Sequence, residues 1–147
     1  MLIWPIVALV VLLLLVGVLR KRPIEPTPLD LTGMVADETG MPVKILQPGE
    51  GPVPVRGSRV RVHYTGWLED GRKFDSSVDR KRPFTFRLGR GEVITGWDQQ
   101  VALMHVGEKR RVVIPSQMAY GERRAGMIPP NSNLVFDIEL LGIEETA

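Results

Sequence analysis

The sequence predicts an α+β domain, in which an antiparallel β-sheet packs against one short α-helix, preceded by a single transmembrane helix. Three observations lead to this fold class. Several segments after Val43 alternate apolar and polar residues, as strands with one buried face do. Residues 94–104 instead repeat their apolar side chains at helical spacing. Residues 2–19 are uncharged and apolar over the length that a membrane-spanning helix requires.

The N-terminal segment has 16 apolar residues at positions 2–19, all but Pro5 and Gly17. As a helix it would span about 27 Å, close to the hydrocarbon thickness of a bilayer. A buried helix of a soluble protein would show a polar face, which this segment lacks. A cleaved signal peptide is the other alternative, but no basic residue precedes the segment and no Ala-x-Ala-like site follows it. These features favour an uncleaved anchor.

Three basic residues, Arg20, Lys21 and Arg22, directly follow the apolar segment. Because basic flanks tend to stay in the cytoplasm, we expect a single-pass membrane protein whose domain lies in the cytoplasm. A periplasmic or other extracytoplasmic location is the alternative. Prolines recur over the next stretch, so the chain divides into three parts. These are an anchor with its basic flank at residues 1–22, a linker at 23–40 and a folded domain at 41–145.

The predicted strands follow in order along the domain. Residues 59–64 alternate strictly, with Val60, Val62 and Tyr64 on one face and basic side chains on the other. The last strand, at residues 134–140, likewise gathers its apolar side chains on one face. Further strands are predicted at residues 43–46, 84–88 and 109–114, with a turn at Asp70-Gly71 before Phe74.

Residues 94–104 form the single predicted helix. Its apolar side chains share one face: Ile94, Trp97, Val101 and Met104. Thr95 is expected to cap the N-terminus, with the Asp98 carboxylate complementing the positive end of the helix. Gly107 is expected to end the helical segment. A sheet with one apolar face and a helix with one apolar stripe bury both by packing together.

The composition excludes several chemistries. The chain has no cysteine and two histidines, so thiolate nucleophiles, disulfides and cysteine-based or histidine-rich metal sites are excluded. Neither a Gly-x-Ser-x-Gly elbow nor a Gly-x-x-x-x-Gly-Lys loop occurs. The net charge of +2 comes from the basic flank of the anchor, since residues 23–147 carry 16 basic and 17 acidic side chains. That balance argues against a nucleic-acid partner, which needs a basic surface.

Aromatic residues stand at or beside the ends of the predicted apolar faces. They are Tyr64, Phe74, Phe84, Trp97, Tyr120 and Phe136. Packing in the core is the ordinary role of a lone aromatic side chain. A sheet with one helix needs only part of this set for its core, so an apolar binding pocket with a few polar tips is the alternative use.

An ordered series of motifs resembles the FKBP-type peptidyl-prolyl cis-trans isomerases. The similarity covers roughly residues 41–143 in one collinear order. It implies a twisted antiparallel sheet wrapped around one short α-helix, as the periodicities indicate independently. The motifs are VHYTG at 62–66, LEDGRKFDSS at 68–77, VITGW at 93–97, AYG at 119–121, IPPN at 128–131 and LVFDIEL at 134–140.

The resemblance also implies a site and its ligands. The expected ligands are proline-containing segments of client proteins and the macrolide inhibitors of the family, with no cofactor and no metal. Trp97 is expected as the floor of the pocket, Asp75 as the group that fixes Tyr64, and the Tyr120 hydroxyl and Ile94 N–H as donors to substrate carbonyls. The catalytic set would be Tyr64, Asp75, Trp97, Tyr120 and Phe136, and the substrate-binding set Phe74, Phe84, Val93, Ile94 and Ile128, with Ile128 over the rim.

Such a reaction needs no nucleophile. Rotation about an X–Pro bond meets a barrier of about 20 kcal/mol because resonance stiffens the amide. Water favours the planar, more polar amide, so an apolar pocket that excludes water should lower the barrier. Two other functions stay open: a docking module for proline-containing peptides with little turnover, and an assembly factor for membrane proteins whose tether raises the local concentration.

Two short segments bear on partners. The linker and the loop between Tyr120 and Ile128 are too short for the dimerisation and chaperone domains of some relatives, so we expect a monomer. Arg123 and Arg124 in that loop either bias substrate preference or form a solvated tip. The basic run at residues 80–82 is expected to lie in a solvated loop, with contact to phosphate or lipid as the alternative.

Overall fold

A computed structural model of the protein describes residues 26–144, and the predicted anchor at 2–19 lies outside them. The elements are β1 (Val35–Ala36), β2 (Pro42–Gln47), β3 (Arg59–Leu68), β4 (Lys73–Ser76), β5 (Phe84–Arg87), α2 (Thr95–Val101), β6 (Lys109–Ile114), the 3₁₀ helix η1 (Ser116–Met118) and β7 (Leu134–Glu144). No helix within the described range combines the length and apolarity needed to cross a bilayer.

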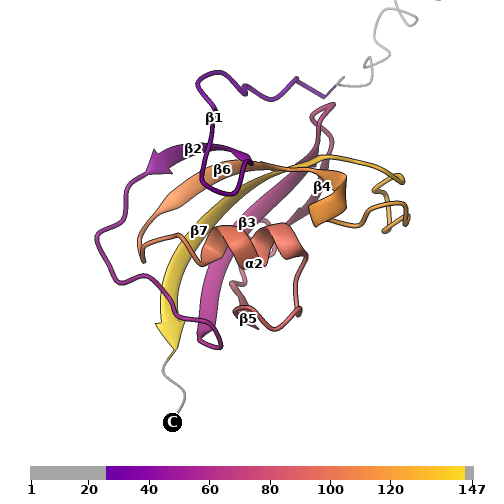
Figure 1. Ribbon diagram of the computed structural model, residues 1–147. Helices are drawn as coiled ribbons and strands as arrows, with labels where there is room; N and C mark the ends of the chain where they lie inside the picture. Colours follow the sequence, from indigo (N-terminus) through magenta and orange to yellow (C-terminus); the bar gives the residue numbers. More distant parts are fainter. Residues whose placement is uncertain (1–25, 145–147) are drawn as a thin grey trace, which may run out of the picture.

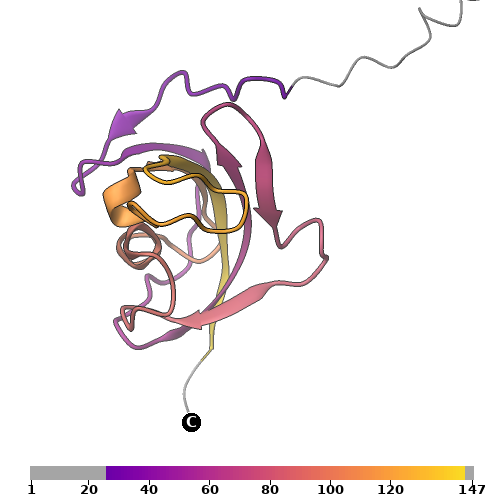
Figure 2. The same cartoon turned by 90° about the vertical axis from the view of Figure 1, so that its right-hand side faces the viewer.

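The strands form one antiparallel sheet in the order β1-β2-β6-β7-β3-β4, with β5 also paired to β3. The sheet curves around α2, which lies against its concave face (Figure 1). Turned by 90°, the molecule shows the sheet bending over the helix, with β5 and its loops closing the lower side (Figure 2). This arrangement confirms the predicted α+β class, an antiparallel sheet around one short helix.

The long strand β3 carries the predicted alternation. Val60 and Val62 are fully buried and Tyr64 is 9% exposed, while their neighbours on the strand face outward. On one side β3 pairs with β7 along its whole length. On the other side it pairs first with β5 and then with β4, because neither short strand spans the full edge. The switch between β5 and β4 lies beside Tyr64, where the functional site forms.

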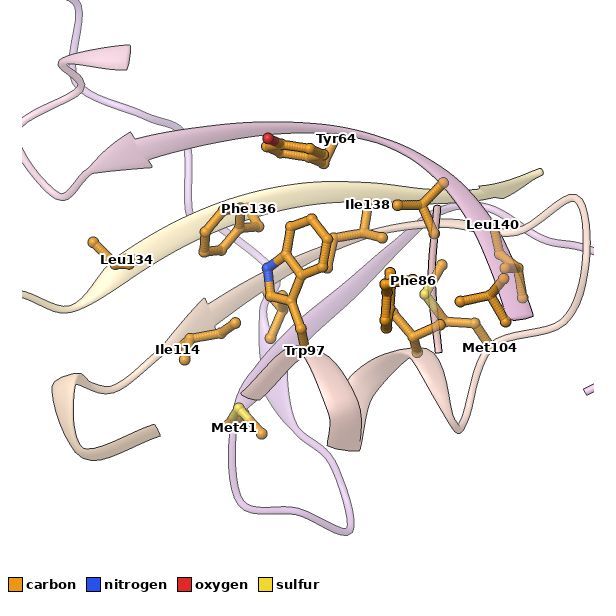
Figure 3. Packing of buried hydrophobic residues seen from close by; sticks show 14 of the residues in the cluster. Met41, Tyr64, Phe86, Trp97, Met104, Ile114, Leu134, Phe136, Ile138 and Leu140 are labelled. Carbon is orange, nitrogen blue, oxygen red and sulfur yellow. The ribbon is translucent and has the colours of Figure 1, made fainter. Parts of the chain in front are cut away.

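The core lies between the concave face of the sheet and α2. Trp97 and Val101 of the helix pack against inward side chains of β3, β6 and β7 (Figure 3). Gly96 allows this close approach, since a Cβ there would lie 2.5 Å from Ile114 Cγ2. The contributions of the three strands to the core are Val60, Val62, Tyr64 and Leu68, Val112 and Ile114, and Leu134, Phe136, Ile138 and Leu140.

The ends of the helix differ from those predicted. Ile94 precedes α2 in an extended conformation and no side chain caps the helix, so Thr95 is not the N-cap. The Asp98 carboxylate accepts hydrogen bonds from the N–H groups of Gly89 (2.8 Å) and Gly91 (3.2 Å), which fixes the preceding loop. The α-helix ends at Val101, and Gly107 instead forms the turn before β6 with a φ of +91°.

Part of the predicted linker contributes to the sheet. Val35 and Ala36 form β1, which pairs with Val43 and Pro42 of β2. The short strand follows a segment that runs along the body of the protein from residue 26 (Figure 2). The predicted linker at residues 23–40 therefore contributes one strand, β1, to the sheet.

Candidate active site

A hollow of about 170 Å³ opens where the sheet curls over the N-terminal end of α2. Strands β3, β4, β5 and β7, the helix and the loops before α2 and after η1 each contribute to its walls. Nine of the ten residues assigned to the site from the sequence line it, and Glu92 is added. The lining is Tyr64, Phe74, Asp75, Phe84, Glu92, Val93, Ile94, Trp97, Tyr120 and Phe136.

Trp97 lies at the centre of the aromatic lining. Its ring centroid is 4.8 Å from that of Tyr64, 5.3 Å from that of Phe136 and 6.1 Å from that of Phe84, each pair edge-to-face. Figure 3 shows the indole beside Phe136 and below Tyr64, rising from the helix toward the sheet. Edge-to-face contacts fix the relative tilt of aromatic rings as well as burying them. The geometry therefore places the Trp97 indole among the apolar walls of the pocket.

Gly66 of β3 makes room for the phenyl rings on one wall. A Cβ at this position would lie 2.6 Å from Phe74 Cζ and 2.7 Å from Phe136 Cε1. The two rings meet edge-to-face at 5.6 Å directly over the glycine. Any larger residue would push at least one ring toward the hollow, so the backbone of Gly66 is itself part of the wall.

Polar groups gather at one edge of the pocket. The Tyr64 hydroxyl donates a hydrogen bond of 2.5 Å to Asp75 Oδ2. Burial raises the pKa of the Tyr64 hydroxyl, and the bond to Asp75 raises it further. Burial alone would raise the pKa of Asp75, but the hydrogen bonds from Tyr64 and Arg80 outweigh it and hold that pKa below its usual value. The pocket thus has a neutral phenol beside a carboxylate that stays ionised.

Arg80 completes this polar edge. Its guanidinium pairs with Asp75 and donates a 3.0 Å hydrogen bond to the Tyr64 hydroxyl, and it lies 5.8 Å from the centroid of the Tyr64 ring. Sequence reasoning placed Arg80 in a solvated loop and missed this role. The side chain is half exposed, as the pattern indicated, but nothing in the sequence shows that the loop after β4 returns to Tyr64.

The loop before α2 supplies the opposite wall through Val93 and Ile94. The Ile94 carbonyl accepts hydrogen bonds from Trp97 N–H (3.0 Å) and Asp98 N–H (3.3 Å). Its own N–H has no acceptor among residues 26–144, which leaves a backbone donor at the pocket wall. Glu92, which sequence reasoning missed, accepts a 2.7 Å hydrogen bond from Arg87 N–H and so ties the loop to β5.

Tyr120 stands at the mouth, with 42% of the residue exposed. Backbone hydrogen bonds from Gly121 N–H to Ser116 O (2.8 Å) and from Asn131 N–H to Gly121 O (2.7 Å) hold its loop. The Tyr120 hydroxyl has no hydrogen-bond partner among residues 26–144, so it is available to a ligand that enters the hollow.

The structure places Ile128 away from the pocket lining. Ile128 and Ala125 exchange two backbone hydrogen bonds, of 2.8 and 3.1 Å, which close a tight turn. The turn folds the Ile128 side chain inward, where it is 5% exposed and joins the core. Ile128 is thus part of the core and not of the residues that line the hollow.

The lining suits a small apolar ring followed by a carbonyl group. Aromatic side chains of β3, β4, β5, β7 and α2 line the hollow, and the Ile94 N–H and Tyr120 hydroxyl are available as donors. No group of three or more potential metal ligands converges in the part of the chain that the structure describes. The arrangement can bind and dehydrate a prolyl amide, the chemistry that the sequence predicted.

Comparisons with known proteins identify the family of the chain. The family model described as FKBP-type peptidyl-prolyl cis-trans isomerase matches residues 51–141. An FK506-binding protein of Neisseria meningitidis serogroup A is 52% identical over 104 residues, covering 70% of this chain and 95% of the relative. The peptidyl-prolyl cis-trans isomerase Fkbp12 of Drosophila melanogaster is 51% identical over 107 residues, covering 71% of this chain and 99% of the relative.

A solved structure shows the same fold. The crystal structure of AtFKBP13 matches with a TM-score of 0.71 at 42% sequence identity, covering 76% of this chain and 98% of that one. The family match also contains every residue that lines the hollow, from Tyr64 to Phe136. The chain therefore belongs to the FKBP family and is an FKBP-type peptidyl-prolyl cis-trans isomerase.

Proposed function

We propose that the aromatic hollow accelerates rotation about X–Pro bonds in client proteins by removing water from the amide and favouring its twisted form. The observation that carries the proposal is the convergence of Tyr64, Trp97 and Phe136 on one hollow that has Asp75 at its edge. The proline ring would rest on Trp97. The amide would then sit among phenyl rings, away from bulk solvent.

The barrier is lowered because the pocket treats the two forms of the amide differently. A planar amide is stabilised by resonance and by hydrogen bonds to water, and a twisted amide loses most of both. An apolar wall removes the water-dependent part of this preference. Only interactions stronger in the twisted form raise the rate, so the lining must fit that form better. No bond is broken and no covalent intermediate forms.

The polar groups orient the substrate in this scheme. The Tyr120 hydroxyl and the Ile94 N–H would each donate to a carbonyl of the bound segment. Asp75 and Arg80 both hydrogen-bond the Tyr64 hydroxyl and so fix the orientation of the Tyr64 ring. The ring then stays in place as the wall beside Trp97. Each hydrogen bond is modest, so the apolar lining supplies most of the specificity for proline.

The test is the cis-to-trans relaxation of short Leu-Pro and Phe-Pro peptides with and without the purified full chain. We expect Phe136→Ala and Asp75→Ala to lower kcat/KM much more than Arg123→Ala, because Arg123 is on an exposed loop outside the hollow. Equal effects from the three variants would contradict the site. Peptide binding without acceleration would instead favour a docking module.

The same pocket is proposed to bind macrolides. The support is the printed description of the meningococcal relative, an FK506-binding protein, together with the lining described above. FK506 should inhibit the peptide relaxation competitively and quench Trp97 fluorescence. Inhibition that Phe136→Ala leaves unchanged would place the macrolide elsewhere.

We further propose that residues 2–19 anchor the protein and that the domain assists folding of clients near a membrane, on its cytoplasmic side. The support is the uncharged apolar composition of this segment and the basic residues 20–22 that follow it. A reporter fused after Ala147 that is active only in the cytoplasm is the expected result. Activity only outside the cytoplasm would reverse the orientation.

A further inference from the structure

A second hollow, of about 410 Å³, adjoins the active site. Phe84 lines both hollows, which makes the proline pocket and this hollow neighbours. Two basic side chains of the loop between β4 and β5 face it, together with the first residue of β3. The lining is Arg59, Arg80, Arg82, Pro83, Phe84 and Thr85. We refer to it as the arginine hollow.

The three arginines that line the hollow outnumber the carboxylates that pair with them. Arg59 lies 3.2 Å from Glu144, and Arg80 pairs with Asp75. Arg82 has no carboxylate within 4.0 Å among residues 26–144. One guanidinium at the hollow is therefore open to an anionic ligand.

The adjoining sheet face adds to this charge. Arg59 of β3 stands directly opposite Arg87 of β5, and Arg61 stands opposite Thr85. Like charges directly opposite on neighbouring strands destabilise a sheet. Arg59 of this pair is already bound to Glu144. Neither Arg61 nor Arg87 has a carboxylate within 4.0 Å in the described part of the chain. Arg61 and Arg87, which stand opposite the lining residues Thr85 and Arg59, thus add positive charge beside the hollow.

We propose that the arginine hollow is a substrate subsite that binds the carboxylate of an aspartate or glutamate lying a few residues from the proline of a client segment. The inference rests on the proposed isomerase function and deepens it. Guanidinium groups bind carboxylates through paired N–H donors, which gives them an advantage over isolated cations. The occupant is a peptide because the two hollows are neighbours: Phe84 lines both, and the Arg80 guanidinium of the arginine hollow bonds the Tyr64 hydroxyl of the proline pocket.

The experiment compares matched peptides with the full chain. Each peptide contains Leu-Pro-Phe and a glutamate, glutamine or lysine placed two residues before or two residues after this core. We expect the glutamate peptide to exceed the glutamine peptide in kcat/KM by about threefold at one of the two positions, the size of an exposed ion pair. The ratio should approach one as salt rises from about 0.01 M to about 1 M.

Variants then assign the effect to the hollow. Arg82→Gln should remove the preference for glutamate, Arg82→Lys should retain part of it, and Arg82→Glu should favour the lysine peptide. Lys109→Gln is the matched control, because it removes one positive charge from β6 without touching the hollow and should leave the ratio unchanged.

The outcomes separate the two proposals. Equal rates for glutamate and glutamine peptides, or a preference that survives Arg82→Gln, would overturn the subsite while leaving the isomerase function intact. Failure to accelerate either peptide would overturn the proposed function itself. Equal peptide rates together with Arg82-dependent retention on phosphatidylglycerol over phosphatidylcholine vesicles would assign the hollow to lipid headgroups and contradict the subsite.

Discussion

Gly66 determines how closely two rings of the active site pack. Its missing Cβ leaves the space that the edges of Phe74 and Phe136 occupy. A substituent there meets the rings within 3 Å on both sides, and ring edges held in an edge-to-face pair cannot move apart freely. The specificity of the pocket therefore depends on a residue that has no side chain.

Gly66→Ala should displace Phe136 into the hollow and lower kcat/KM for proline peptides strongly. Overpacking of this kind lowers the free energy of unfolding by about 1–3 kcal/mol. Gly142→Ala on β7 is the matched control, since a Cβ there would lie in ordinary contact, 3.5 Å from Arg61 Nη2. Urea denaturation and peptide relaxation measure the two effects. Similar losses of kcat/KM and stability in Gly66→Ala and Gly142→Ala would show that contact with the two rings does not cause the effect.

The Asp75 carboxylate should make stability depend on pH. Its pKa in the folded protein lies below the ordinary value of 3.8, because hydrogen bonds from Tyr64 and Arg80 outweigh the effect of burial. A depressed pKa in the folded state stabilises the fold at pH values above the unfolded pKa. The contribution is lost as the pH falls through the folded pKa.

The difference in the free energy of unfolding between wild type and Asp75→Asn should therefore be constant, at about 1 kcal/mol, above about pH 5. It should shrink below pH 3.8. Glu122→Gln, on an exposed loop, is the control for general charge effects. Urea denaturation at a series of pH values gives the comparison. A difference that grows as the pH falls would contradict the role assigned to the pair.

At the scale of elements, a buried polar chain holds α2 against the sheet. Gln100 on the helix is fully buried, and its side-chain carbonyl accepts a 2.9 Å hydrogen bond from Arg110 Nη1 of β6. Arg110 in turn lies 2.6 Å from the Glu108 carboxylate. The Gln100 amide donates to Asp37 Oδ2 at 2.9 Å. Four side chains thus join the helix to β6 and to the turn after β1.

Gln100→Leu should lower the free energy of unfolding by about 1–3 kcal/mol, because it leaves the Arg110 and Asp37 groups without a partner. Trp97 lies one turn earlier on the same helix, so KM for proline peptides should rise. Gln99→Leu, on the neighbouring position that is not fully buried, should change neither quantity. Chemical denaturation measures the free energy of unfolding, and peptide kinetics measure KM. An unchanged Gln100→Leu protein would show that the polar chain does not position α2.

The same elements show what periodicity predicts. Alternation placed Val60, Val62 and Tyr64 on the buried face of β3 correctly, since one face of this strand meets the core and the other meets water. Polar residues inside the core do not follow this rule. The alternation of residues does not identify Gln100 and Arg110 as core residues, and only the pairing of distant segments shows that each satisfies the other.

The residues that line the site were predicted more completely than the loop contacts and helix ends around it. Motif order identified nine of the ten lining residues, because each motif keeps a fixed place in the family fold. Arg80 and Glu92 were missed, since their roles depend on loops that return to the pocket through contacts distant in sequence. Helix ends were missed for a related reason: Asp98 bonds a neighbouring loop in place of its own helix end.

At the scale of the whole molecule, the segment before β1 contacts the sheet and the turn between β3 and β4. The Asp30 carbonyl accepts a 3.1 Å hydrogen bond from Arg111 Nη1, and the Thr27 carbonyl lies against Gly71 in the turn between β3 and β4. Figure 1 shows this segment crossing the end of the sheet above that turn. These contacts fix the direction in which the chain enters the domain.

Asp37 is the contact that joins this segment to the helix of the active site. Burial would raise the pKa of its carboxyl, but hydrogen bonds from Thr39 and Gln100 outweigh burial and lower that pKa, so the acceptor is ionised at neutral pH. Asp37→Ala removes the acceptor and leaves the Gln100 amide with Thr39 Oγ1 alone, at 3.1 Å. The segment should then detach more often from α2.

We expect Asp37→Ala to speed protease cleavage and amide hydrogen exchange within residues 26–40, while exchange in β3 and β7 changes little, because those strands form the centre of the sheet. Glu38→Ala is the matched control, since its exposed side chain has no hydrogen bond in the described part of the chain. Faster exchange throughout the sheet would mean that Asp37 stabilises the whole domain. Unchanged exchange in residues 26–40 would show that Arg111 and β1 suffice to hold the segment, and the link to α2 would then have no mechanical role.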